Sequence, residues 1–160
     1  MQDKIVIITI MTFLHNFFTV IWIGGMFTLG LVVFPSIKKV LDMGPQTMQL
    51  INTIQNKLSK FIYIAIAGLF ISGAVMAKAV PEFQGLFNFG NKYSFFLGIK
   101  HILFILMIII AILRSQVVGR NMKGPNPKIV KIKAGMLMLN MFLGLLVLLL
   151  SGLNSTLGQL

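Results

Sequence analysis

The sequence predicts an all-α fold, an integral membrane four-helix bundle with up-down topology and both chain ends outside the cytoplasm (N-out/C-out). The first observation is hydropathy: 57% of the 160 residues are hydrophobic, and the mean hydropathy is +0.93. The second is that only 11% of the residues are charged, whereas a soluble domain carries roughly 25%. The third is that the charges gather in short segments between long apolar runs, as in polytopic membrane proteins. We expect residues 1–160 to form a single transmembrane domain in the lipid bilayer.

Residue composition excludes several classes of function. The chain has no cysteine, which excludes disulfides, thiolate metal sites and haem attachment through a Cys-x-x-Cys-His motif. The formal net charge of +11 would suit a nucleic-acid-binding protein, but the basic residues lie at the ends of apolar runs, where membrane topology accounts for them. We therefore expect no nucleic-acid partner. The carboxylates of Asp3, Asp42 and Glu82 lie outside the predicted spans, so neither an acidic proton relay nor carboxylate-based hydrolysis is supported.

The first predicted span covers about residues 5–34 and ends at Pro35, because proline interrupts a helix. Its length exceeds the roughly 20 residues that cross a bilayer, so tilt or a protruding end is expected. A secretory signal peptide has a shorter apolar core and a small-residue cleavage site. We therefore interpret this run as a retained helix.

The second predicted span covers about residues 61–80 and ends at Pro81. Its helix is expected to begin earlier, because Pro45 suits a first helical position and the apolar residues that follow recur with helical spacing. Small residues on the second and fourth spans, including Ser72 and Ser151, predict close helix packing. The other spans are expected at about residues 93–118 and 132–153, with a polar-aromatic loop at 82–91 and a Gly/Pro-rich turn at 119–128.

The orientation follows from the distribution of lysine and arginine, which favour the cytoplasmic side of a membrane. Ten basic residues flank the side that joins span one to two and span three to four, and three flank the other side. This bias predicts a multi-pass protein of the cell (inner or plasma) membrane with both termini outside the cytoplasm. The ten are Lys38, Lys39, Lys57, Lys60, Arg114, Arg120, Lys123, Lys128, Lys131 and Lys133, and the three are Lys4, Lys78 and Lys92.

The two histidines of the chain, His15 and His101, both lie inside predicted spans. An ionisable side chain at membrane depth is costly and indicates a functional site. His15 comes about ten residues after the start of its span and His101 about eight after the start of its own, and the two helices are expected to run in the same direction. At ~1.5 Å rise per residue, both imidazoles are expected at matching depth in the outer half of the bilayer.

This histidine pair predicts a haem b site. In an up-down bundle the first and third helices face each other across the core, where bundle cofactor sites are built. Neutral histidine is a common axial ligand of haem iron, so we expect His15 and His101 to be the metal ligands. Two alternatives stand beside this interpretation. Either histidine could only hydrogen-bond a neighbouring helix, or His15 alone could bind iron, with water, substrate, Met76 or Met138 as the second ligand.

Three further residues are expected at the cofactor. Trp22 lies deep in its span, away from the interfacial belt where tryptophan is usual, so we expect it to line the interior. Gly98 precedes His101 by three residues, which leaves room for a ring to approach the backbone. Lys100 points about 100° away from His101 around the helix. Its amine is expected either to neutralise a haem propionate or to snorkel outward.

The first span also carries a motif of histidine, tryptophan and glycine. Trp22 follows His15 by seven residues, Gly25 follows Trp22 by three, and a Phe-Pro pair comes later. This motif resembles the first span of the CopD-like and HemJ-like four-helix membrane families, and Lys100 is similar to a lysine at the start of the third span in HemJ-like proteins. HemJ-like proteins are haem b-binding protoporphyrinogen oxidases, and CopD-like proteins are associated with copper uptake. The resemblance implies that His15 is a haem ligand, that Lys100 is its functional partner and that Gly25 belongs to the site.

These observations predict a haem b protein for electron transfer or redox chemistry at the outer membrane face, with a quinone or a redox partner protein. A Leu-Pro-Arg segment of HemJ-like proteins is absent here and His101 lies outside the family pattern, which favours a distinct haem protein. Whether it is an enzyme, with an oxidoreductase as the candidate, and whether it forms oligomers both stay open. Protoporphyrinogen oxidation is one alternative. Copper transport is another, because eleven methionines would suit Cu(I), although Met136 and Met138 do not share a helix face with each other.

Overall fold

Every secondary-structure element among the described residues is a helix. The structure is a computed structural model, and it describes residues 2–42, 44–81, 83, 85, 90–117 and 127–157. The first span is one continuous helix in which π-helical turns (η) alternate with α-helix. Its elements are α1 (Gln2–Thr19), η1 (Val20–Gly24), α2 (Gly25–Phe27), η2 (Thr28–Val33) and α3 (Phe34–Val40). The rest of the bundle comprises α4 (Pro45–Lys78), α5 (Lys92–Ile112), η3 (Leu113–Val117) and α7 (Pro127–Leu157).

Four helices are long and apolar enough to cross a membrane, as predicted. At most 28% of the most apolar stretch of each helix is buried inside the bundle. Large apolar side chains therefore cover the outside of all four helices, and a soluble monomer rarely exposes so continuous an apolar surface. This surface is compatible with a bilayer. The candidate spans are Gln2–Val40, Pro45–Lys78, Lys92–Ser115 and Ile129–Leu157, and examples of the exposed side chains are Phe13, Ile64, Ile105 and Leu149.

The first helix continues through Pro35 to Val40, so the prediction that it ends at Pro35 is wrong. The reason is the π-helical turn η2 immediately before the proline. The Phe34 N–H donates to the carbonyl of Leu29, five residues back, and a new α-helical segment starts at Phe34 with Pro35 in its first turn. A residue in a first turn needs no partner for its N–H, so proline is tolerated there.

The other helix bounds are close to the predicted ones. α4 begins at Pro45, as predicted, and ends at Lys78, shortly before Pro81. α7 begins at Pro127, about five residues earlier than predicted, because proline is favoured in a first helical turn. The last two residues of the predicted 119–128 turn are therefore helical. The remainder of that turn and most of the predicted loop, residues 82, 84, 86–89 and 118–126, lie outside the described residues.

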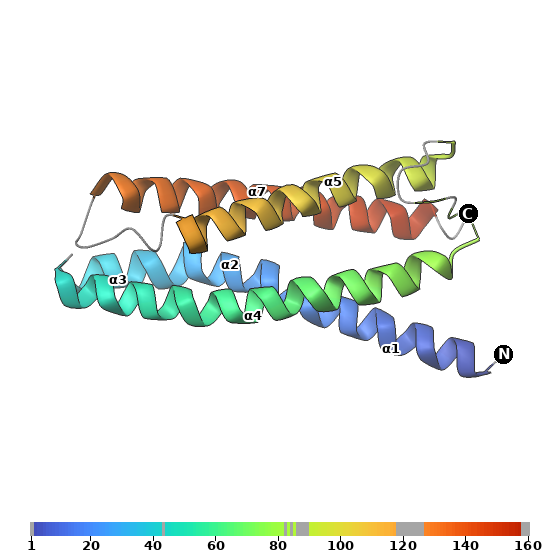
Figure 1. The fold of residues 1–160 in the computed structure, drawn as a ribbon, viewed down its shortest axis with the longest axis horizontal. Coiled ribbons are helices and arrows are strands. Elements are labelled where there is room, and N and C mark those ends of the chain that lie inside the picture. The colour runs from blue at the N-terminus through green and yellow to red at the C-terminus, as the bar shows by residue number, and fades with distance from the viewer. Residues whose placement is uncertain are drawn as a thin grey trace.

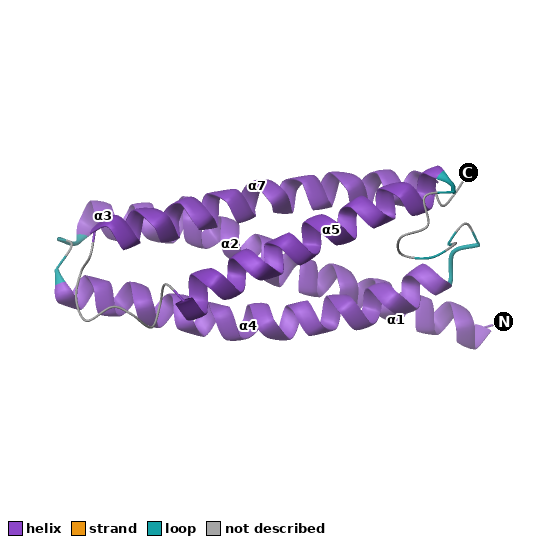
Figure 2. Ribbon diagram, turned by 45° about the horizontal axis from the view of Figure 1, so that its top comes forward, coloured by secondary structure: helices purple, strands orange, loops and turns teal. Residues whose placement is uncertain are grey.

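The four spans lie lengthwise beside one another, and the N and C termini lie at the same end (Figures 1 and 2). α1 packs along α4, and α5 packs along α7. The two pairs join where α2 and η2 contact α7 and where η3 contacts α4. The first and third spans meet across the core, where the rings of Trp22 and Phe104 lie edge to face with centroids 5.3 Å apart.

A tightly packed apolar core occupies the middle of the bundle. Trp22, Met26, Ile62 and Met107 are almost completely buried there and belong to one contact cluster. The side chain of Asn140 crosses this core from α7 and donates through Nδ2 to the carbonyl of Met107 at 3.2 Å. Along the helix axes the core separates a large cavity near the chain termini from a small polar pocket in the opposite half.

Candidate functional site

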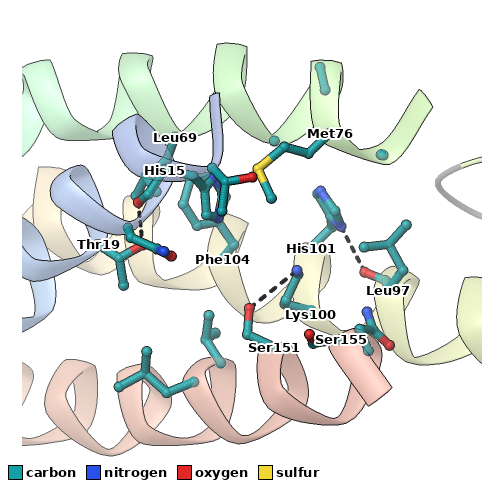
Figure 3. Close-up of a pocket in the computed structure, with 18 of the residues that line it drawn as sticks. His15, Thr19, Leu69, Met76, Leu97, Lys100, His101, Phe104, Ser151 and Ser155 are labelled. Carbon is teal, nitrogen blue, oxygen red and sulfur yellow. Dashed lines mark hydrogen bonds between the residues drawn. The ribbon is translucent and has the colours of Figure 1, made fainter. Parts of the chain in front are cut away.

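A cavity of about 650 Å³ lies in the half of the bundle that contains both chain termini. Residues from all four spans line it, from Ile8 on α1 to Ser155 on α7. Cavities of roughly 300–1,000 Å³ are typical of cofactor and small-molecule sites. The labelled side chains in Figure 3, which all line this cavity, come from α1, α4, α5 and α7. Four of the six residues predicted at the cofactor line it, namely His15, Trp22, Lys100 and His101.

The His15 ring is held against α4 by one hydrogen bond. Its Nδ1 lies 3.0 Å from Ser72 Oγ, and the same hydroxyl lies 2.6 Å from the carbonyl oxygen of Gly68. A carbonyl only accepts, so the single hydroxyl proton goes to Gly68 and Nδ1–H of His15 donates to Ser72. The ring also lies close to the next residue on α4, Gly73, where a Cβ would lie 3.4 Å from His15 Cε1. In this tautomer the lone pair is on Nε2.

His101 has the same tautomer for a different reason. Its Nδ1 lies 2.7 Å from the carbonyl oxygen of Leu97, one turn earlier on α5. Because that oxygen only accepts, Nδ1 carries the proton and Nε2 carries the lone pair. Within the part of the chain that the structure describes, no hydrogen bond engages Nε2 of either ring. Metal-bound histidines use this arrangement, in which the nitrogen that does not bind the metal donates to a protein acceptor.

Lys100 directs its amine across the cavity toward α7. Nζ donates to Ser151 Oγ at 3.4 Å (Figure 3). The amine is therefore directed toward α7, and outward snorkelling, the alternative expected from the sequence, stays a prediction. Its partner in the bundle is a neutral hydroxyl, so the positive charge is not neutralised by that contact. An ammonium group on a cavity wall attracts an anionic group of a ligand.

Two buried polar side chains line the cavity without a partner among the described residues. Trp22 is 1% exposed, and its indole N–H has no acceptor. Asn154 is 5% exposed, and neither its amide oxygen nor its amide nitrogen is bonded. Buried polar groups nearly always have a hydrogen-bond partner. Their presence on the wall indicates that a ligand or ordered water with polar atoms completes this site.

Two of the predicted residues do not line the cavity. Gly25 faces α4 instead, where a Cβ would lie 3.0 Å from Leu58 Cδ1. Gly98 is buried on α5 but is not on the cavity wall. Of the two methionines considered as second iron ligands, Met76 lines the cavity. Met138 is 71% exposed on the outside of the bundle, so it is not a ligand here.

Sequence reasoning misses the serine and asparagine members of the site. Ser72 and Ser151 are expected from the sequence to serve close helix packing, and only the pairing of α1 with α4 and of α5 with α7 places their hydroxyls on His15 and Lys100. Asn154 lies near the end of α7, where a polar residue is unremarkable in the sequence. Its burial, which makes it informative, depends on the tertiary contacts around it.

The donor set suits haem iron better than a bare metal ion. The described residues contain no group of three or more His, Cys, Asp or Glu side chains that could hold an ion. A bare ion in this cavity would have two imidazoles and would need the Met76 thioether or an external ligand in addition. Haem iron is already bound by its macrocycle and needs only axial ligands. The two Nε2 atoms are of the type that could bind haem iron, and the Lys100 amine could pair with a propionate.

No family model, curated protein or solved structure matches the chain.

Proposed function

We propose that this protein binds one haem b in the cavity near the chain termini and uses it for electron transfer or redox chemistry. The proposal rests on the position and hydrogen bonding of the two imidazoles. His15 and His101 line one cavity, each has Nδ1 engaged by a protein acceptor, and each has a free Nε2. When bound, haem supplies one-electron iron chemistry.

Each side chain of the cavity has a proposed role toward the haem. His15 would hold the iron through Nε2, and Ser72 fixes the orientation and tautomer of the His15 ring. His101 would hold the iron through its own Nε2. Lys100 neutralises a propionate, and the unpaired amide of Asn154 provides a polar contact at the ligand's edge.

We place the haem in the outer half of the cell membrane. The basic residues concentrate at the end of the bundle opposite the cavity, and such residues favour the cytoplasmic side. In this orientation both termini are outside the cytoplasm. A quinone or a redox partner protein would then exchange electrons with the haem near the outer face.

The decisive experiment is a reduced-minus-oxidised absorption spectrum of the full chain purified in detergent, combined with metal analysis. We expect one haem b per chain and a low-spin spectrum typical of two nitrogen axial ligands. His15→Ala should abolish haem binding. His101→Ala should retain haem but convert it to a high-spin form. A colourless protein with stoichiometric copper would overturn the proposal, and an unchanged spectrum in His101→Ala would remove that residue as a ligand.

Copper transport is the second candidate function, and one observation favours it. The thioether of Met76 lines the same cavity as both imidazoles, and a set of two nitrogens and one sulfur suits copper. Met76→Leu separates the two candidates. It should lower copper binding if copper is the ligand, and it should leave a bis-histidine haem spectrum unchanged.

Protoporphyrinogen oxidation is a third candidate, and the position of Lys100 on the cavity wall beside the histidines favours it. The test is growth of a strain that lacks this activity. Complementation by the wild-type chain, and its loss in Lys100→Met, would support the oxidase. Failure to complement, with haem present in the purified protein, would leave electron transfer as the function.

A further inference from the structure

A second polar site lies in the half of the bundle opposite the haem cavity. A pocket of about 140 Å³ opens between α4, the end of the third span and the start of α7. All seven side chains that line it are polar, in a part of the bundle where apolar side chains are otherwise packed. Four of the seven, Asn52, Gln55, Asn56 and Ser59, recur every three or four residues and so form one face of α4.

Two cations face this pocket, and both are more than nine-tenths buried. Arg114 is 6% exposed and Lys133 is 8% exposed, and both are on the pocket wall. The Nη1 atom of Arg114 is buried and has no hydrogen-bond partner among the described residues. Burying a charge without a counter-charge is strongly unfavourable. The pair therefore requires an anion.

The chain itself does not supply that anion. Its three acidic residues are Asp3, Asp42 and Glu82. The two that the structure describes, Asp3 and Asp42, do not line the pocket, and Glu82 follows the end of α4 at Lys78 in the sequence, whereas the pocket residues of α4 are at positions 52–59. Residues 83–160 contain no Asp or Glu at all, so the segment that joins η3 to α7 has no carboxylate to contribute. The counter-ion must therefore come from outside the chain.

The remaining side chains of the pocket specify the kind of anion. Two hydroxyls and three carboxamides can each donate a hydrogen bond, and together with a guanidinium and an ammonium they form a set that suits an oxyanion with several acceptor atoms. The volume of about 140 Å³ is enough for such a group and is well below the roughly 300 Å³ at which cofactor sites begin. A nucleotide or a second haem would not fit.

We propose that Arg114 and Lys133 bind a phosphate group in this pocket, with the amide and hydroxyl side chains of α4 and Ser115 as further donors. The phosphate belongs either to a lipid headgroup or to a free phosphate ion. The pocket residues Arg114 and Ser115 are the last two of the third candidate span, Lys92–Ser115, and the ends of membrane-spanning helices lie near the lipid headgroups. Two exposed lysines on α4, Lys57 and Lys60, are next to the pocket residues Asn56 and Ser59 in the sequence and attract anions toward the pocket.

The test measures thermal unfolding of the full-length protein in two arms. In the first arm, delipidated protein in detergent is titrated with inorganic phosphate, against sodium chloride at matched ionic strength to account for screening. In the second arm, the protein is reconstituted in phosphatidylcholine nanodiscs with and without phosphatidic acid. A rise in the unfolding midpoint in the first arm assigns the site to free phosphate, and a rise in the second arm alone assigns it to a headgroup.

The variants are Arg114→Gln and Lys133→Gln, each of which removes one pocket charge. Each should weaken the apparent affinity for the phosphate group at least about tenfold, because a hydrogen bond to a charged group is lost. The matched control is Lys131→Gln, which removes the same charge from an exposed position two residues from Lys133 and should bind like the wild type. Ser59→Ala is a milder pocket variant that should show a smaller loss of affinity even if a charge variant fails to fold.

Two results would overturn the proposal. One is the absence of any phosphate-specific stabilisation of the wild type in both arms. The other is an equal loss of affinity in Lys131→Gln and in the two pocket variants, since this would mean that the anion binds the basic surface and not the pocket. Neither readout depends on haem, so the result is independent of the proposed redox function.

Discussion

At the scale of single residues, the two histidines differ in what fixes them. The Nδ1–H of His101 bonds to a carbonyl of its own helix, so its tautomer is set locally. The Nδ1–H of His15 bonds to Ser72 on another helix, 57 residues away in the chain. The orientation of the His15 ring therefore depends on how α1 packs against α4, which makes it the more sensitive of the two to mutations elsewhere in the bundle.

Ser72→Ala is expected to weaken haem binding without unfolding the protein. The substitution removes the acceptor that holds His15 Nδ1–H, and loss of such a partner typically lowers affinity for a bound metal by about 10–100-fold. The measurement is the rate of haem transfer to an excess of a soluble apo-globin. Ser72→Thr, which keeps a hydroxyl, should restore most of the affinity.

Ser36→Ala is the matched control for this prediction, because Ser36 is an exposed serine on α3 far along the chain from the cavity. It should lose haem at the wild-type rate. Equal rates for Ser72→Ala and the wild type would show that Ser72 does not orient the His15 ring.

At the scale of elements, the first span is the least regular of the four. It contains two π-helical turns, η1 and η2, on either side of α2. Such turns are rare and frequently occur at functional sites. η1 carries Trp22, which borders the cavity, and η2 allows the helix to continue through Pro35. Trp22 of η1 lines the cavity, and Leu29 of η2 belongs to the apolar core.

Close packing of α1 against α4 predicts an effect of Gly68→Ala. A Cβ at Gly68 would collide with the ring of Phe18, and overpacking of this kind costs about 1–3 kcal/mol. We expect a lower unfolding midpoint in detergent and faster haem loss, because the collision pushes apart the helices that carry Ser72 and His15.

Gly135→Ala on α7 is the control, since a Cβ there would meet nothing within 4 Å. Alanine is favoured over glycine within a helix by about 0.5–1 kcal/mol, so this variant should be as stable as the wild type or slightly more stable. An equal loss of stability in both variants would contradict the packing argument.

At the scale of the whole molecule, the bundle has two polar regions separated by an apolar core. The cavity lined by His15 and His101 lies toward the chain termini, and the pocket lined by Arg114 and Lys133 lies toward the opposite end. The core between them, with Trp22 and Met107 almost completely buried, excludes water along the bundle axis. We infer that binding at one site does not affect the chemistry of the other. We also infer that no continuous polar path joins the two sites across the membrane.

The proposed orientation can be tested by cysteine labelling, because the chain has no native cysteine. In right-side-out membrane vesicles, Lys4→Cys and Thr156→Cys, both at exposed positions, should react with a membrane-impermeant maleimide. Lys39→Cys, which is exposed at the opposite end, should react only after the membrane is permeabilised. The reverse pattern would place the haem cavity in the cytoplasmic half.

The sequence by itself determined the helical class and the number of apolar spans, and it predicts a common depth for the two histidines. These properties depend only on residues that are close together in the sequence. The hydropathy of a span does not depend on what the helix packs against, and the predicted depth follows from the fixed rise per residue of a helix. Trp22 could be placed in the interior for the same reason. The sequence pattern wrongly predicted that the first helix ends at Pro35, because the π-helical turn that accommodates this proline has no signal in the sequence.

The tertiary structure alone decided which groups meet. Ser72 reaches His15, Ser151 reaches Lys100, and Arg114 and Lys133 share one pocket because helices far apart in the chain pack side by side. From the sequence alone, Ser72 and Ser151 are assigned to helix packing, and Arg114 and Lys133 are assigned to membrane orientation. Such residues indicate a binding site only when they are buried, because an unpaired polar atom is energetically costly only once water is excluded from it.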